Sequence, residues 1–178
     1  MSDRITELRT ENMHLKSQVE DLENKVLSLV GMISLEPSGE GKNKELLNDK
    51  LIEFINTTTD QLNIVTPKVD RFYSVELKKI VEKGIPILLI TGDRSTLDKS
   101  YRQFYDDLKK TPGIQILNNP NVKYLLMFNT EKAIYSGGSL DKDVLSSSIL
   151  IATTIIEKSK IRLIAEIFSA MLPSFMRQ

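Results

Sequence analysis

The stretch that decides the fold is NVKYLLMFNTEKAIYSGGSL, residues 121–140. Two apolar segments, residues 122–128 and 132–136, flank a short polar reversal and predict a β-hairpin. Lys123 lies at the start of the first segment, and a Gly-Gly-Ser turn at residues 137–139 follows the second. A lysine charge and a glycine turn with free backbone N–H groups are both suited to holding a phosphate. The hairpin therefore has the layout of a phosphate-binding site.

Outward from the hairpin, residues 44–178 alternate helical and strand-like segments, which is typical of an α/β layer structure. Asp70 is expected to cap one of the helices and Gly84 to end it. The apolar run IPILLIT, residues 85–91, is typical of a parallel strand that is buried on both faces. These segments and the hairpin predict one α/β domain with a mixed sheet. We expect helices over residues 44–58, 69–84, most of 92–113 and 158–176, and strands over residues 61–67, 85–91, 114–117, 122–128, 132–136 and 147–156.

The first 33 residues repeat apolar side chains every seven residues, which predicts a leucine-zipper-like coiled coil. Leucine at each d position and β-branched residues at a favour two strands, and a lone asparagine at a favours parallel pairing in register. A long helix packed on its own domain is the alternative, and it usually has a broader apolar stripe. The pattern resembles the zippers of basic-zipper transcription factors, without their basic region. The predicted dimerisation positions are Ile5, Leu8, Asn12, Leu15, Val19, Leu22, Val26 and Leu29, and Ile33 continues the repeat.

The segment SLEPSGEGKN, residues 34–43, follows the last heptad and concentrates proline, serine and glycine. Such a composition breaks a helix and predicts a flexible joint. The expected organisation is therefore a coiled coil over residues 1–33, a linker over residues 34–43 and a globular domain over residues 44–178.

The composition excludes several kinds of site and partner. The 24 basic residues balance the 24 acidic ones, so no whole-chain charge favours nucleic acid, which is not an expected partner. There is no cysteine, and the single histidine, His14, falls on the outer face of the predicted coil. We therefore expect no metal site and no cofactor. No secretory signal follows Met1, and the apolar run at residues 144–156 is too short to span a membrane. We read that run as a buried strand and expect a cytoplasmic protein.

The order of elements over residues 45–175, with the hairpin and its glycine turn, resembles a single half of the phospholipase D superfamily. The motif of that family is His-x-Lys, four further residues, Asp, and then about six residues to Gly-Ser. Laid on this chain, the lysine and the Gly-Ser element are present, whereas the histidine and the aspartate are replaced. The matched positions are Asn121 for the histidine, Lys123, Phe128 for the aspartate, and Gly138 with Ser139.

The resemblance implies that this chain is not an enzyme. In that family the histidine attacks phosphorus and forms a covalent intermediate. A neutral asparagine amide offers no usable lone pair for such an attack, and the only histidine lies on the predicted coil. What the family layout leaves is a binding site for a small sugar- or phosphate-bearing ligand. Its candidate residues are Asn121, Lys123, Gly138 and Ser139, with Arg94 after a neighbouring strand, where α/β folds place ligand loops.

Each of these residues also has a purely structural interpretation. Lys123 would then be a solvent-facing residue, the Gly-Gly-Ser segment a turn selected for its backbone freedom, and Arg94 a residue at the start of a helix. A coiled coil joined to such a domain also resembles the sugar-binding effector half of TrmB-type transcriptional regulators. We therefore expect a non-catalytic homodimer that senses a ligand or acts as a scaffold for a partner protein, with a link to transcription regulation. The alternatives are a residual phosphodiesterase or nuclease and a nucleic-acid-binding dimer.

Overall fold

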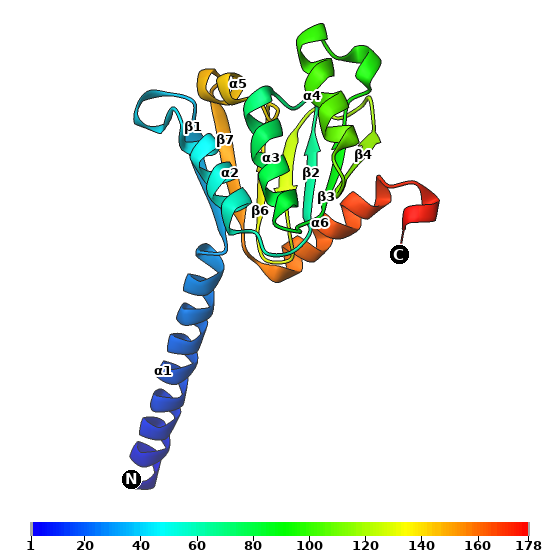
Figure 1. Ribbon diagram of the computed structural model, residues 1–178. Coiled ribbons are helices and arrows are strands. Elements are labelled where there is room, and N and C mark those ends of the chain that lie inside the picture. The colour runs from blue at the N-terminus through cyan, green and yellow to red at the C-terminus, as the bar shows by residue number, and fades with distance from the viewer. Residues whose placement is uncertain (1, 178) are drawn as a thin grey trace.

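The computed structural model describes residues 2–177, with the side chains of residues 4–26 and 31–177. Helix α1, Ser2–Val30, projects as a rod from a domain built around one seven-stranded sheet (Figure 1). The predicted coil position Leu29 lies outside the described side chains, and Ile33 lies beyond the end of the helix. None of the described helices is both long and apolar enough to cross a membrane.

The sheet is mixed, as the sequence predicts, and its strand order is β1-β7-β6-β5-β2-β3-β4. Strands β2, β3 and β4 are parallel to one another, whereas β5, β6, β7 and β1 join their neighbours in antiparallel fashion. The carboxyl ends of the three parallel strands therefore share one edge of the sheet with the start of β5 and the end of β6. The strands are β1 Ile33–Ser38, β2 Leu62–Thr66, β3 Ile87–Thr91, β4 Ile114–Asn118, β5 Leu125–Phe128, β6 Ala133–Ser136 and β7 Leu150–Ile155.

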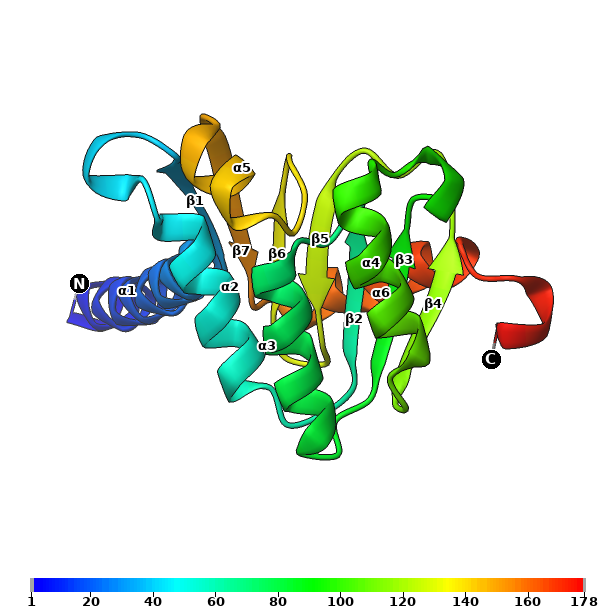
Figure 2. The ribbon, with the colours of Figure 1, turned by 45° about the horizontal axis from the view of Figure 1, so that its top comes forward.

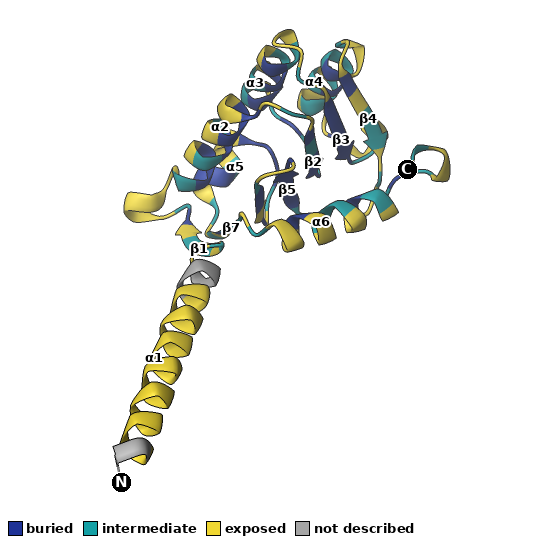
Figure 3. Cartoon of the chain, turned by 90° about the horizontal axis from the view of Figure 1, so that it is seen from below, coloured by how far each residue is buried: buried dark blue, intermediate teal, exposed yellow. Residues whose placement is uncertain are grey.

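The two faces of the sheet are covered unequally (Figures 1, 2 and 3). Four helices pack on one face and form the larger core, which holds apolar side chains such as Leu51, Leu77 and Leu108. Helix α6 lies on the other face and closes a smaller core around Phe168. The helices of the domain are α2 Leu46–Thr57, α3 Arg71–Glu82, α4 Lys99–Lys110, α5 Lys142–Ser147 and α6 Lys158–Ala170, with 3-10 turns at Gly41–Asn43, Arg94–Thr96 and Ser174–Met176.

The ends of α3 confirm the sequence prediction for this helix. The carboxylate of Asp70 accepts a hydrogen bond from the N–H of Tyr73 at 2.8 Å, which satisfies a free donor of the first turn. At the other end, Gly84 has φ +85°, a conformation that glycine adopts without steric cost.

The structure corrects the flexible joint that the sequence predicts over residues 34–43. Residues 33–38 form strand β1, which pairs with β7 from Ile33 opposite Ile155 to Ser38 opposite Leu150. Pro37 fits this strand because β1 lies at the edge of the sheet, where one row of backbone groups has no neighbouring strand. The globular domain therefore begins at Ile33, and only the second half of the predicted joint is a loop.

Two further strand predictions need correction. The run at residues 144–156 is not one buried strand, because its first residues belong to α5 and β7 begins only at Leu150. Helix α5 starts where the side chain of Asp141 accepts the N–H of Val144 at 3.1 Å, a cap that the sequence analysis overlooked. The first hairpin strand also begins later than predicted, at Leu125, so Lys123 precedes it.

Candidate functional site

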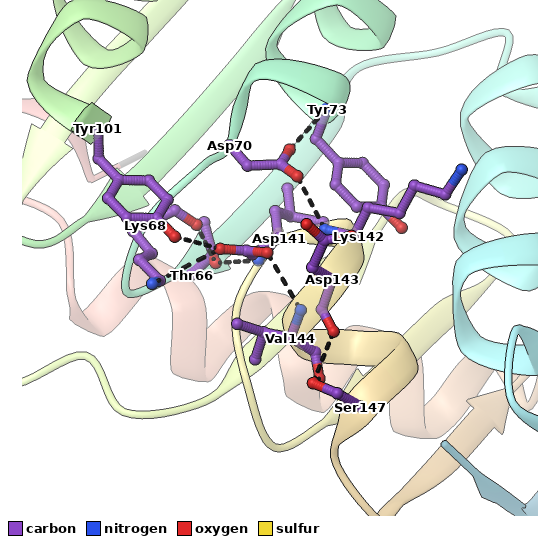
Figure 4. Close-up of polar contacts among 11 residues, drawn as sticks. Thr66, Lys68, Asp70, Tyr73, Tyr101, Asp141, Lys142, Asp143, Val144 and Ser147 are labelled. Carbon is purple, nitrogen blue, oxygen red and sulfur yellow. Dashed lines mark hydrogen bonds and ion pairs between the residues drawn. The ribbon is translucent and has the colours of Figure 1, made fainter. Parts of the chain in front are cut away.

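Polar side chains gather at the carboxyl edge of the parallel strands, where two loops meet (Figure 4). One loop follows β2 and the other follows β6 and leads into α5. A residue from α4 completes the group. We call this group the Asp141 cluster, and its members are Thr66, Lys68, Asp70, Tyr101 and Asp141.

Backbone hydrogen bonds hold the two loops together. The N–H of Leu140 donates to the hydroxyl of Thr66 at 2.9 Å, and the carbonyl of Leu140 accepts the N–H of Asp70 at 2.8 Å. The carboxylate of Asp70 in turn accepts the N–H of Lys142 at 2.8 Å. An isolated parallel bridge between Val69 and Leu140 lies among these bonds. The side chains of the cluster are therefore fixed by paired backbone, not carried on free loops.

Asp141 is the centre of the cluster and is only 4% exposed. One oxygen of its carboxylate caps α5, while the other accepts the hydroxyl of Tyr101 and lies 3.5 Å from the ammonium of Lys68. The same ammonium lies 4.0 Å from the centroid of the Tyr101 ring. Lys68 is thus held by an ion pair and by a cation-π contact at once.

The electrostatics favour the charged form of both partners. Burial alone would raise the pKa of Asp141, but the Tyr101 hydroxyl, the Val144 N–H and Lys68 outweigh it, so the pKa lies below its ordinary value. Burial likewise acts against the charge of Lys68, yet Tyr101 and Asp141 hold its pKa above the ordinary value. The ion pair therefore persists on both sides of neutral pH. Burial raises the pKa of Asp70, since its two N–H donors compensate only in part.

A buried polar network supports the cluster from below. The hydroxyl of Tyr73 donates to the side-chain oxygen of Asn48 at 2.5 Å. The two N–H groups of the Asn48 amide share three acceptors: the Ser146 hydroxyl at 2.9 Å, the Lys142 carbonyl at 3.1 Å and the Glu45 carboxylate. Burial holds the pKa of Tyr73 far above its usual range, so the hydroxyl stays neutral and keeps donating. Helices α2, α3 and α5 are thereby tied together beneath Asp141.

The structure places Asn121 and Lys123 on the same edge, in the turn that precedes β5. Both side chains are exposed, and the N–H of Asn121 donates to the side chain of Asn119 at 3.0 Å. Lys123 has no ion pair with any described residue. These two residues are therefore available to a ligand, although nothing in the protein fixes their side chains.

The other three predicted residues have structural neighbours. Gly138 has φ +83°, and the carbonyl of Ser139 accepts the N–H of Asp141 at 2.7 Å, so this turn positions the Asp141 cluster. Arg94 is committed elsewhere, because Asp106 on α4 accepts two hydrogen bonds of 2.6 Å from its guanidinium. Of the predicted residues, Ser139 is the one that contacts the cluster through its backbone.

Phe128, at the position of the family aspartate, lies in the apolar core at the far end of β5. It is 3% exposed, and its ring stacks edge-on with Phe168 of α6 at 5.1 Å between centroids. The neighbouring Asn129 donates to Asp60 at 2.9 Å and accepts two backbone N–H groups of the hairpin turn. Phe128 and Asn129 therefore stabilise the fold at this end of the hairpin, and the position of the family aspartate itself holds no acidic group.

The sequence analysis missed Lys68, Tyr101 and Asp141. The available signal was their position: Lys68 follows β2 and Asp141 follows β6, at the edge where α/β folds place functional loops. Tyr101 could not be found in that way because it comes from a helix. Among the residues with described side chains, no group of three or more His, Asp or Glu could hold a metal ion.

No family model and no curated protein matches the chain. Several solved structures do match it. NucT from Helicobacter pylori has a TM-score of 0.66 and 13% identity, with 78% of this chain and 95% of NucT covered. Nuc from Salmonella typhimurium, a phospholipase D family member, has a TM-score of 0.64 and 10% identity, with 78% and 91% covered. These likenesses show a phospholipase D-like fold.

A third similar structure is TrmBL2, described as an archaeal chromatin protein with a novel mode of DNA binding. Its TM-score is 0.57 with 11% identity, and the match covers 93% of this chain and 65% of TrmBL2. The share of this chain is larger than the globular domain alone can supply. The likeness therefore extends into α1.

Proposed function

We propose that this chain is a non-catalytic, homodimeric binding protein that holds a small sugar- or phosphate-bearing ligand at the carboxyl edge of its phospholipase D-like domain. The observation that carries the proposal is which residues occupy two motif positions and how exposed they are. Asn121, in the place of the nucleophile, is a solvent-exposed amide, and Phe128, in the place of the aspartate, is buried against Phe168. Covalent catalysis requires a nucleophile and a group that activates it, and neither position supplies one.

The same edge retains groups suited to binding. Lys123 offers an exposed ammonium for an anionic group, and the amide of Asn121 can both donate to and accept from a hydroxyl. Lys68, although paired with Asp141, keeps 27% of its side chain exposed. In this proposal the Asp141 cluster forms the rigid part of the site. The turn at residues 121–124 forms the part whose side chains can adjust to a ligand.

The homodimer is supported by the apolar seam of α1. Its a and d side chains are between 52% and 60% exposed on the isolated rod, far more than a core side chain tolerates. A parallel two-stranded coiled coil would bury this seam, and the two Asn12 amides would satisfy each other across it. The seam consists of Ile5, Leu8, Leu15, Val19, Leu22 and Val26.

A thermal-shift screen with sugars, nucleotides and inorganic phosphate tests the binding half of the proposal. We expect at least one compound class to raise the melting temperature of the wild type and to lose that effect in Lys123→Ala. Lys160→Ala, which removes an exposed lysine from α6, is the matched control and should keep the effect. A screen without any shift, or a shift that survives in Lys123→Ala, would contradict the assignment of the site.

The proposed absence of catalysis is tested with a generic phosphodiester such as bis(p-nitrophenyl) phosphate. We expect no turnover above the uncatalysed rate. Cleavage that disappears in Lys123→Ala would establish a residual phosphodiesterase or nuclease and overturn this half of the proposal.

One observation favours a second candidate, a nucleic-acid-binding dimer linked to transcription regulation. The likeness to TrmBL2, which binds DNA, covers both the domain and part of the rod. Fluorescence anisotropy with a labelled DNA duplex at 50 and 200 mM salt distinguishes the candidates. Binding that weakens about a hundredfold or more between these salt concentrations would support phosphate contacts and this candidate. Undetectable binding at both would leave the small-ligand proposal.

A further inference from the structure

Three strands of the sheet present an uncovered apolar surface on the side of α6. Helix α6 runs from the end of β7 across β5 and β2, and it leaves β1 and part of β7 without a covering helix (Figure 1). The strand register places Leu35 and Tyr135 on either side of Thr153, and Pro37 opposite Ile151, on this same face. None of these positions carries a charge. We call this surface the open face, and it consists of Ile33, Leu35, Pro37, Tyr135, Ile151 and Thr153.

Three neighbouring apolar side chains of the open face are largely exposed to solvent. Leu35 is 68% exposed, Ile151 62% and Tyr135 45%, and all three lie on adjacent strands. Next to them, a hollow of about 240 Å³ separates Tyr135 from Ile164 and Ile167 of α6. The open face thus has protruding side chains and an apolar recess beside them, a combination that can be self-complementary.

The orientation of β1 argues that this face is covered in the working protein. Glu36 points to the opposite side and pairs with Lys50 of α2, and Ser38 accepts the N–H of Leu47 at 3.0 Å. The strand therefore turns its polar residues toward a helix and its apolar residues toward water. A strand with one wet face normally has the reverse alternation, because a register that exposes apolar residues loses the free energy of burying them.

We propose that the open face packs against the open face of a second copy of this chain. The proposal rests on the proposed homodimer and adds a second interface to it. Helix α1 ends at Val30, and β1 begins three residues later at Ile33. The N–H of Ile156 donates to the carbonyl of Met32 at 2.8 Å and fixes this junction to the sheet. The seam of the rod and the apolar side of β1 are therefore consecutive along the chain.

Parallel pairing of the rods brings the two β1 strands to the same place. Both chains leave a parallel coiled coil at the same end, so their first strands emerge next to each other. A twofold axis along the coil then relates the two open faces, so that a contact between them would be isologous. Such a contact would fix the orientation of the two carboxyl edges relative to each other.

Thiol labelling of the full chain tests this contact directly. The chain has no cysteine, so a single introduced thiol is its only one. Ile151→Cys reports on the open face, and Val75→Cys is the matched control, because Val75 is 45% exposed on α3 at the other face of the sheet. We expect both variants to be dimers by light scattering. With a maleimide reagent, Ile151→Cys should react at least tenfold more slowly than Val75→Cys.

The outcomes separate this inference from the proposed function. A dimer in which Ile151→Cys reacts as fast as Val75→Cys overturns the second interface and leaves the coiled-coil homodimer intact. A monomer by light scattering overturns both. A second variant avoids reliance on thiol chemistry: Leu35→Glu should weaken dimerisation at least tenfold by sedimentation equilibrium with unchanged circular dichroism, whereas Val75→Glu should not. Equal dissociation constants for these two variants would also overturn the contact.

Discussion

The Asp141 cluster and the turn at residues 121–124 lie on the same edge of the sheet, yet they differ in how they are held. In the cluster, each charged group has a partner, and two loops are joined by backbone hydrogen bonds. In the turn, Asn121 and Lys123 are exposed and little fixes them. Shifted pKa values alone would have identified the cluster as the active centre, although its groups satisfy one another. The residues that remain free for a ligand lie in the turn, where the side chains are exposed and have few partners.

The largest expected effect concerns the third motif position, Phe128. Restoring the family residue with Phe128→Asp would place a carboxylate in the apolar core beside Phe168, with no partner. We expect a loss of about 4 kcal/mol or more in the free energy of unfolding, measured by denaturant titration, because a buried unpaired charge is costly. Phe128→Leu is the control and should lose only about 1–2 kcal/mol. If the Asp variant were as stable as the Leu variant, this end of the hairpin would have to be open to water.

The next effect tests whether the Asp141 cluster supports the fold. Asp141→Ala removes the cap of α5 and leaves the Tyr101 hydroxyl and Lys68 without their acceptor. We expect it to lower the free energy of unfolding by about 2–4 kcal/mol. Asp143→Ala, a change of an exposed carboxylate two residues away, should have little effect in the same titration. Similar results for the two variants would mean that the cluster contributes nothing to stability.

The sequence was sufficient for the order of most elements, because hydrophobic periodicity and caps such as Asp70 are local signals. It was insufficient for β1, whose proline and serines are typical of a joint until β7 provides a partner strand. It was also insufficient for α5, since a six-residue helix with several serines has almost no periodic pattern. Edge strands and short helices depend on their neighbours more than on their own composition.

The same distinction explains what was missed in the candidate site. Lys123 could be predicted as a candidate because it belongs to a spaced motif, in which Asn121 stands at the position of the family histidine. Lys68, Tyr101 and Asp141 are separated by tens of residues, and only the pairing of two loops with a helix brings them together. Arg94 follows a strand, where α/β folds place ligand residues. The sequence analysis did not predict the break between Arg94 and α4 that lets the guanidinium reach Asp106.

The pH dependence sharpens the comparison further. The pKa of Asp141 in the folded protein lies below the unfolded value of about 3.9, so its stabilisation is complete above that pH and is lost as the pH falls through the folded pKa. Asp141→Asn keeps an oxygen for the cap but cannot titrate. We expect it to be less stable than the wild type by about 1–2 kcal/mol at pH 7, with a gap that begins to close below about pH 4 and narrows further as the pH falls through the folded pKa.

Asp70 has the opposite pH dependence. The useful quantity is therefore the difference in the free energy of unfolding between the wild type and Asp141→Asn. Burial raises the pKa of Asp70, so its ionisation destabilises the fold as the pH rises. Both proteins retain Asp70, and most of its contribution cancels in the difference. Urea titrations of wild type and Asp141→Asn at half-unit intervals from pH 3 to 7 measure the gap. A gap that is constant across this range would show that the Asp141 carboxylate is not stabilised by its partners.

The smallest expected effect compares the two lysines of the edge. Lys68→Met keeps the apolar stem but removes the counter-charge of Asp141 and the contact with the Tyr101 ring, so it should cost about 1 kcal/mol. Lys123→Met should change the free energy of unfolding by less than about 0.5 kcal/mol, because this side chain is exposed and has no ion pair with a described residue. Added salt should reduce the Lys68 effect by screening the pair and leave the Lys123 effect unchanged. Equal costs for the two substitutions would remove the distinction between a lysine held by the fold and a lysine left free for a ligand.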